Sequence, residues 1–358
     1  MTSSLGVYAA EPAYPILAHS LLQAPSDSLT NGRDVRLDSE PGQNWNLKDD
    51  WEQGIQKSGN GIFRCGVVVG ISRLKSRSKD TDEYVGQIPR YLLTSHLLNT
   101  GPSSSETSAF IIHPNNFDAL APRLLLHALQ STNVNTTTAM TTMATRSTAA
   151  ASHPQQAGLS RTDALKYLDS VQLLPVQSLP NAAQAINTVS DALQKLQDKR
   201  RSAAEPERPV VLIVAGLDTL AEAIIRASNP LRGTALLAAT LRNVNRLART
   251  HGSWLSIILV NTSGLGPAHY DLTPSVETDQ VEKPRKEMPR KVSGEDHIYS
   301  LFPSPGGPLL STLLMKTLDQ GIDTHVLLSN VKAAQVAEVI KDRTGPGLGK
   351  WGIWSPRR

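Results

Sequence analysis

The residues at the end of the first strong apolar segment are of types that bind phosphate. Residues 67–71 are mostly β-branched and apolar, which is typical of a buried strand. Gly70, Ser72, Lys75 and Lys79 lie within this segment and just after it. In phosphate-binding loops, glycine lets backbone N–H groups approach the phosphate, lysine neutralises its charge, and a Ser or Thr hydroxyl holds Mg²⁺. A phosphate contact is therefore the first chemistry to consider.

The segment lacks the complete phosphate-binding motif G-x-x-x-x-G-K-[ST]. Its residues are Gly70-Ile71-Ser72-Arg73-Leu74-Lys75-Ser76-Arg77-Ser78-Lys79. Without further glycines the backbone does not form the nest of N–H groups that surrounds a phosphate. A phosphate contact from Lys75 or Lys79 is one interpretation, and a solvated basic loop is the other.

A second glycine-rich stretch, residues 345–350, lies near the C-terminus. Its sequence, G-P-G-L-G-K, is one residue short of the phosphate-binding spacing, and Trp351 stands where the motif has a hydroxyl. We therefore predict a turn that leads into a terminal edge strand over residues 351–354.

A basic cluster lies in the long polar stretch over residues 263–305. Its members are Lys283, Arg285, Lys286, Arg290 and Lys291. Flexible basic side chains bind the phosphates of nucleic acids without specifying their base sequence. Four acidic residues dilute this charge: Glu282, Glu287, Glu295 and Asp296. The cluster predicts DNA contact, and a solvated charge run is the alternative.

The sequence offers no pattern for other common chemistries. Residues 262–266, T-S-G-L-G, lack the leading glycine of a hydrolase nucleophile elbow. The histidines are not spaced as H-x-x-x-H, and Gly70 and Gly216 alone do not make a dinucleotide fingerprint. The lone Cys65 excludes an intramolecular disulfide and is interpreted as a core thiol. We predict no catalytic residue and no metal site.

Strands and helices must alternate along the chain to position these residues. The apolar runs predict strands over residues 65–71, 109–112, 171–176, 210–214, 255–260 and 324–328. Helical spacing of apolar residues predicts helices over residues 88–99, 120–130, 182–199, 219–227, 236–250 and 309–318. Repeated strand–helix units imply an α/β fold, with a mostly parallel twisted sheet and helices on both faces.

The length of the chain indicates one large core with appendages. The chain has 358 residues, a length at which a single domain with tails is the simplest organisation. We predict a flexible N-terminal arm over residues 1–55 and a core over residues 56–358. A low-complexity insertion at 131–160 and a long mobile loop at 263–305 interrupt this core.

The net charge of +4 and the pI of about 9.1 permit contact with nucleic acid without requiring it. The N-terminus lacks a secretory pattern, and no stretch approaches the about 20 apolar residues of a membrane span. We therefore expect a cytosolic or nuclear protein that does not enter a membrane.

Two strands and the elements between them resemble a known family. Residues 211–217 are V-L-I-V-A-G-L, and residues 256–262 are S-I-I-L-V-N-T, with a predicted helix between them. Residues 323–328, D-T-H-V-L-L, add a later strand. In their order and strand texture, residues 60–355 resemble RecA-type recombinases and their eukaryotic paralogues. The resemblance implies a RecA-like core of the P-loop type.

The resemblance also implies a nucleotide site at the ends of these strands, with Gly70, Ser72, Lys75 and Asn261 as its remnants. Three of the family's features are missing. The phosphate-binding loop is incomplete, Ala215 stands at the position of the Walker B acid, and residues 113–116, H-P-N-N, lack the glutamate that positions the attacking water. Asp218, three residues after Ala215, is interpreted as a helix cap.

The resemblance predicts a recombinase-paralogue-like accessory protein in DNA repair by homologous recombination. We expect it in the nucleus, bound through the sheet edge and the arm to a recombinase or paralogue subunit, without ATP turnover. Single-stranded or branched DNA is the expected second ligand.

One alternative is a DNA-dependent ATPase of the same fold, using ATP and Mg²⁺, whose P-loop was lost from the sequence through a wrong exon boundary. Another is an unrelated α/β scaffold, because a fold does not fix a function.

Overall fold

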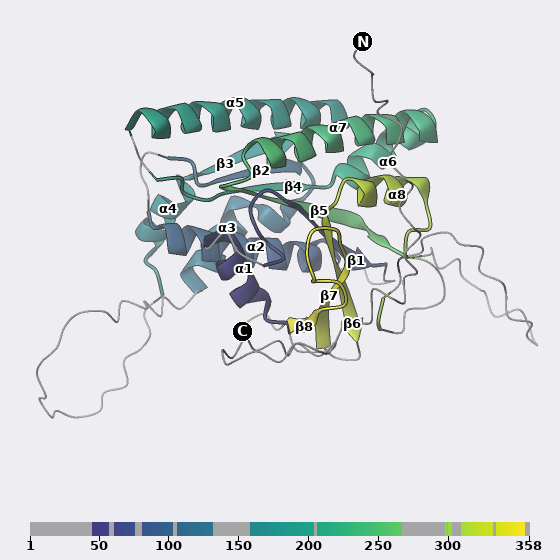
Figure 1. The fold of residues 1–358 in the computed structure, drawn as a ribbon, viewed down its shortest axis with the longest axis horizontal. Coiled ribbons are helices and arrows are strands. Elements are labelled where there is room, and N and C mark those ends of the chain that lie inside the picture. The colour runs from purple at the N-terminus through teal and green to yellow at the C-terminus, as the bar shows by residue number, and fades with distance from the viewer. Residues whose placement is uncertain are drawn as a thin grey trace, which may run out of the picture. The chain divides into compact units, whose positions relative to one another are not determined.

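Strands and helices alternate along the chain and form an eight-stranded sheet with helices packed on both faces (Figure 1). The computed structural model describes residues 45–56, 61–75, 81–102, 106–131, 158–203, 206–266, 298, 300–302, 309–331 and 334–354. These residues belong to one compact unit that begins at Pro41.

The sheet is parallel except at one side. Its strands are β1 (Val68–Leu74), β2 (Ala109–Pro114), β3 (Val171–Val176), β4 (Val210–Ala215), β5 (Leu255–Leu265), β6 (Thr324–Val331), β7 (Ala334–Asp342) and β8 (Trp351–Trp354). They lie in the order β3-β2-β4-β5-β1-β6-β7-β8. The first six are mutually parallel, and β7 and β8 are antiparallel to their neighbours. The predicted α/β class with a mostly parallel sheet is confirmed.

The helices form two layers. One layer holds α1 (Leu47–Gln56), α2 (Thr81–Thr100), the 3-10 helix η2 (Asp118–Leu120), α3 (Pro122–Ser131) and α4 (Arg161–Leu168). The other holds α5 (Leu179–Ala203), α6 (Leu217–Ala227), α7 (Pro230–Thr250) and α8 (Leu313–Gln320). In Figure 1, α5 and α7 run side by side over one face of the sheet, and α2 and α3 cover the other. Among the described helices, none is long and apolar enough to cross a bilayer.

The alternation of side chains along each strand divides the core into two clusters. In β4, Val211 and Ile213 pack with α1 to α4, whereas Leu212 and Val214 pack with α5 to α8. All of β4 is buried, as expected for a central strand of a parallel sheet. Trp51 is a fully buried side chain of the first cluster and Trp254 of the second.

The core begins earlier than residue 56. Leu47, Trp51 and Ile55 bury one face of α1, and the backbone N–H of Trp45 donates to the carbonyl of Trp351 in β8. Residues 45–55 of the predicted arm are therefore part of the core. Residues 1–44 lie outside the described residues.

Several other boundaries differ from those predicted. Strand β5 continues to Leu265, so residues 263–265 of the predicted long loop lie in the sheet. Helix α2 begins at Thr81, so Pro89 lies inside the helix and not in its first turn. Helix α4 and strand β7 were not predicted. The predicted bounds of β3 and β8 are confirmed. Residues 132–157 of the predicted insertion and 267–297 of the predicted loop lie outside the described residues.

Candidate functional site

The carboxyl ends of β1, β4 and β5 form the candidate site. Strands β2 to β5 lie on one side of β1, and β6 to β8 lie on the other. The chain therefore switches sides at β1, and ligands of open α/β sheets bind outside the carboxyl ends of the strands at such switch points. The predicted nucleotide-site residues Gly70, Ser72, Lys75 and Asn261 all come from β1 and β5 or the residue after β1.

Strand β1 remains paired with its neighbours where a phosphate-binding loop would leave the sheet. Its pairing with β5 runs to Ser72, opposite Asn261, is interrupted by an irregularity, and resumes at Leu74, opposite Leu265. Its pairing with β6 continues to Arg73. The N–H of Lys75 donates to the carbonyl of Leu265 over 2.8 Å. This N–H therefore joins β1 to β5 and is not directed at an anion. Residues 76–80, which include Lys79, lie outside the described residues.

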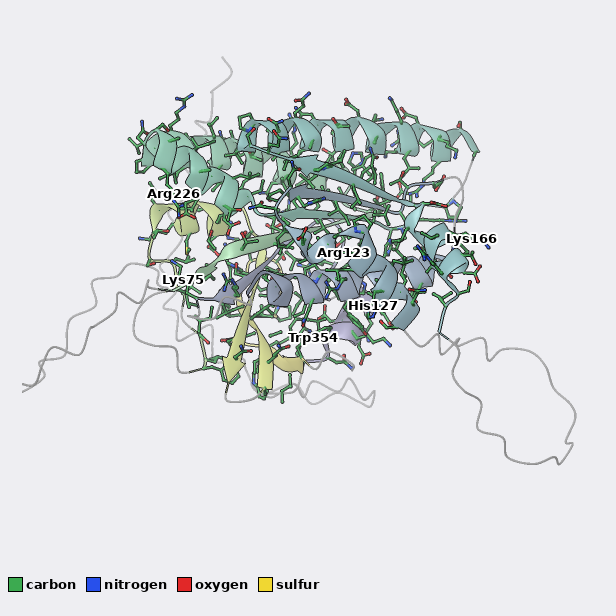
Figure 2. The ribbon with its side chains drawn as sticks, turned by 180° about the vertical axis from the view of Figure 1, so that it is seen from behind. Lys75, Arg123, His127, Lys166, Arg226 and Trp354 are labelled. Carbon is green, nitrogen blue, oxygen red and sulfur yellow. The ribbon has the colours of Figure 1, made fainter. Side chains whose placement is uncertain are left out.

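Gly70 serves packing within the sheet. A Cβ at this position would lie 2.4 Å from Cδ1 of Ile322, the residue two positions before β6. Glycine thus lets Ile322 pack directly on the backbone of β1. Lys75, labelled in Figure 2, is partly exposed, and its side chain lies beside Gly264, which adopts a positive φ of 74°.

Ser72 and Asn261 meet in a buried chain of hydrogen bonds that crosses the sheet. Nδ2 of Asn261 donates to Oγ of Ser72 over 2.8 Å, and this Oγ lies 2.7 Å from Nε2 of His325 in β6. Nδ1 of His325 lies 3.0 Å from Oδ1 of Asp319 in α8. Nζ of Lys341 in β7 donates to Oδ2 of Asp319 over 2.7 Å. We call these five residues the Ser72–Lys341 network.

The hydrogen-bond partners of each residue determine where the protons of the network lie. An ionised Asp319 only accepts hydrogen bonds, so we assign the proton to Nδ1 of His325, and Nε2 accepts from the Ser72 hydroxyl. Burial acts to raise the pKa of Asp319, but His325 and Lys341 outweigh burial and hold this pKa below its usual value. Burial lowers the pKa of Lys341, and Asp319 partly offsets that effect. The network therefore contains a buried ion pair between Asp319 and Lys341.

The serine, histidine and aspartate have the contacts of a nucleophilic triad. In an accessible site, such a histidine would take the serine proton as a general base. Here the Ser72 side chain is fully buried and already accepts a hydrogen bond from Asn261, so a substrate does not reach it. The arrangement instead ties β5, β1, β6, α8 and β7 together.

The carboxyl end of β4 is closed by packing. Ala215 ends the strand, and Gly216 has a φ of 69° and is the N-cap residue of α6. Asp218 lies in the first turn of α6 with a fully buried side chain, which accepts from the backbone N–H of Ser263 and from the Thr262 hydroxyl at 3.3 Å. The prediction that Asp218 caps the helix is wrong, because the N-cap residue is Gly216. The carboxyl group of Asp218 instead holds the end of β5 to α6.

The end of β2 also packs against this region. A Cβ on Gly216 would lie 2.6 Å from Cγ of Pro114, so the proline ring lies directly against the turn after β4. His113 contacts the Pro114 carbonyl through Nδ1 at 2.9 Å, and Asn115 and Asn116 are exposed. The carboxyl ends of β2 and β4 therefore pack against each other through Pro114 and Gly216.

Replacing Asp218 by asparagine tests how the buried carboxyl group affects the free energy of unfolding as pH changes. Burial raises the pKa of Asp218 in the folded state, despite the hydrogen bonds from Ser263. Its stabilising contribution is therefore present below the unfolded pKa of about 4 and is lost as pH rises through the folded pKa. We expect the stability of the wild type relative to Asp218→Asn, measured by urea unfolding, to fall as pH rises.

The control for this measurement is Asp191→Asn, which changes an exposed side chain on α5. This variant should follow the wild-type curve. A wild-type advantage over Asp218→Asn that grew with pH would contradict the interpretation.

Comparison with known proteins adds no assignment: no protein-family model matches the chain, and a search of curated proteins finds no match. The predicted DNA-contacting residues Lys283, Arg285, Lys286, Arg290 and Lys291 lie outside the described residues. In the described part of the chain, no group of three or more His, Cys, Asp or Glu side chains could hold a metal ion.

The sequence prediction missed three members of the network, namely Asp319, His325 and Lys341. Ser72 and His325 lie 253 positions apart, and no short motif links them. Pairing of β1 with β6 brings the two residues together, and that pairing is set by the tertiary fold.

Proposed function

We propose that this protein is a recombinase-paralogue-like accessory subunit of homologous recombination that has a RecA-like core and acts without ATP turnover. It binds a recombinase or paralogue subunit in the nucleus, with DNA as a second ligand. The observation that carries this proposal is a central β1 that stays hydrogen-bonded to β5 and β6 where a nucleotide-binding loop would begin.

The order of elements supports the resemblance on which the proposal rests. In the recombinase family, a helix pair separates the Walker B strand from the strand that ends in a polar residue near the nucleotide. Here α6 and α7 separate β4 from β5, and Asn261 lies near the end of β5. Strand β5 lies between β4 and β1, which brings the three corresponding strand ends together.

The chemistry of this region supports a protein that does not hydrolyse ATP. Ala215 lacks the carboxylate that would orient Mg²⁺, and Asp218 is buried and engaged with the end of β5. The N–H of Lys75 is engaged with Leu265, and Ser72 with His325. Transfer of a phosphoryl group depends on positioned donors and a metal ion, and these residues do not supply them.

The sheet edges support association with a partner. Strand β3 is one edge of the sheet and β8 is the other. Edge strands offer unpaired backbone groups to an extended segment of another chain. Trp45, the first described residue, donates its backbone N–H to the carbonyl of Trp351 in β8. We therefore assign the part of the predicted arm, residues 1–55, that precedes Trp45 to this association together with the edges.

Co-purification tests the proposed function. The full-length chain, tagged and expressed with recombinase-type subunits of its own cell, should co-elute with at least one of them in stoichiometric amount. An unrelated α/β protein carrying the same tag serves as the control. Failure to associate with any of these subunits would count against the proposal.

Nucleotide binding separates the proposal from the ATPase alternative. We expect ATP with Mg²⁺ to leave the thermal unfolding midpoint unchanged. A ligand present at 100 times its Kd would instead stabilise the fold by about 2.7 kcal/mol. Such a shift, together with a transcript that encodes a complete glycine-rich loop between residues 67 and 90, would favour the ATPase.

A further inference from the structure

Helix α7 carries positive charge without any acidic residue. Its 21 residues include Arg232, Arg242, Arg246 and Arg249 and contain no Asp or Glu. All four arginines are exposed. Because surface helices of soluble proteins usually mix both signs of charge, this helix suits an anionic ligand.

The four arginines lie on one side of the helix. Together with Ala235 and Ala239 they recur at intervals of three or four residues, which places them on a single stripe of an α-helix. The opposite side of α7 is buried against the sheet and includes Leu237, Leu241 and Val244. Packing of this apolar side fixes the stripe toward solvent.

Ion pairs among the described residues leave most of the stripe available. Arg249 is held by Asp323, with an N···O distance of 2.7 Å. The described residues include no ion pair of Arg232, Arg242 or Arg246. The neighbouring helix α5 has exposed residues of both signs, with a small positive excess: Asp191, Lys195, Asp198, Lys199 and Arg201.

The shape and composition of the stripe indicate which polyanion fits. From Arg232 to Arg249 it extends about 26 Å along a straight helix, at about 1.5 Å per residue. Guanidinium groups match phosphate oxygens in two parallel hydrogen bonds. The helix contains no aromatic residue on which an unstacked base could lie, which disfavours single strands. A rigid row of phosphates, as in a duplex, fits these features.

We propose that the arginine stripe of α7 binds the phosphate backbone of duplex DNA, independently of base sequence. The site is separate from the basic cluster at residues 283–291 and does not depend on the recombinase-like function. The guanidinium groups of Arg232, Arg242 and Arg246 make the contacts, and Arg249 is anchored to Asp323 at the end of the row.

The test compares two double variants of the full-length chain. Arg242→Ala with Arg246→Ala removes two charges from the stripe. Arg123→Ala with Lys166→Ala removes two charges from α3 and α4, in the opposite helix layer (Figure 2). Binding to a fluorescent duplex of about 30 base pairs is measured by fluorescence anisotropy over a range of salt concentrations. This duplex is roughly 100 Å long, which exceeds the length of the stripe.

We expect the stripe variant to bind about tenfold more weakly. The slope of log K against log salt concentration should be smaller in magnitude by about 2, because each phosphate contact that is lost reduces the number of released counterions by about 0.9. The control variant should bind as the wild type does. Replacing the five basic residues at 283–291 by alanine should leave the effect of the stripe variant in place.

Three outcomes would overturn the proposal. The first is equal affinity of the stripe variant and the control variant. The second is loss of the stripe effect once the 283–291 cluster is neutral, which would assign the binding to that cluster. The third is displacement of the duplex by polyglutamate at equal charge concentration, which would favour an acidic protein as the partner.

Discussion

Replacing Asp319 by asparagine should lower the free energy of unfolding by about 3–5 kcal/mol at neutral pH, the range for breaking a buried ion pair from one side. The substitution keeps the shape of the side chain but removes its charge. Lys341 then stays largely buried beside a neutral amide, and His325 loses its anionic acceptor. Urea unfolding followed by circular dichroism measures the loss.

The pH dependence distinguishes this ion pair from simple packing. The pKa of Asp319 is lowered in the folded state, so its contribution is present above the unfolded pKa of about 4 and is lost as pH falls through the folded pKa. The stability gap between the wild type and Asp319→Asn should therefore narrow in acid. A gap that stayed constant with pH would indicate that packing, and not charge, accounts for the loss.

Three further variants complete this experiment. Asp163→Asn removes an exposed carboxylate that pairs with Lys166 on α4, and its effect on stability should be much smaller. Adding Lys341→Met to Asp319→Asn removes the second buried charge and should restore part of the lost stability. With the single variant Lys341→Met as the fourth member, a double-mutant cycle gives the coupling free energy between the two residues.

Replacing Trp51 by alanine should cost about 3–5 kcal/mol, because it removes a large buried side chain and leaves a cavity. The indole is 1% exposed and meets the ring of Phe63 edge to face at a centroid distance of 5.5 Å. Thermal unfolding followed by circular dichroism should show a lower midpoint.

The control for Trp51 lies on the exposed side of the same helix. Lys48→Ala, together with Glu52→Ala, removes an exposed i,i+4 ion pair and should change stability by about 0.5 kcal/mol or less. If residues 45–55 were part of a detached arm, Trp51→Ala would be as mild as this control.

The parallel core could be predicted because its strands are buried on both faces. Continuous runs such as residues 210–214 are apolar without alternation, and the helices between them carry apolar residues at helical spacing. These local patterns sufficed for the class of the fold. The predicted bounds of β3 and β8 also match, although both are partly buried edge strands. Local patterns carry no information on which strands become neighbours.

Two missed elements have different causes. Helix α1 had a usable signal, since Leu47, Trp51 and Ile55 recur every four residues, but the surrounding polar residues favoured the interpretation as an arm. The sequence of strand β7, in contrast, favours the wrong type of element. This sequence, AQVAEVIKD, is rich in residues that favour helices, and pairing with β6 and β8 overrides that preference.

Sequence reasoning selected two residues that the structure brings together, but not the partners they contact. The resemblance predicts Ser72 and Asn261 as remnants of a nucleotide site, and in the structure Asn261 donates a hydrogen bond to Ser72. Their partners come from β6, β7 and α8, whose pairing with β1 a linear sequence does not reveal. The role of Gly70 was likewise hidden, because it depends on Ile322, 252 positions later.

The placement of the tryptophans has a spectroscopic consequence. Four of the five, Trp45, Trp51, Trp351 and Trp354, gather around α1 and β8, whereas Trp254 alone belongs to the cluster under α5 to α8. The centroid of its indole ring lies 5.2 Å from the guanidinium carbon of Arg200 and 5.0 Å from the centroid of the His251 ring. Comparing the intrinsic fluorescence of the wild type with that of Trp254→Phe therefore reports the two helix layers separately as they unfold.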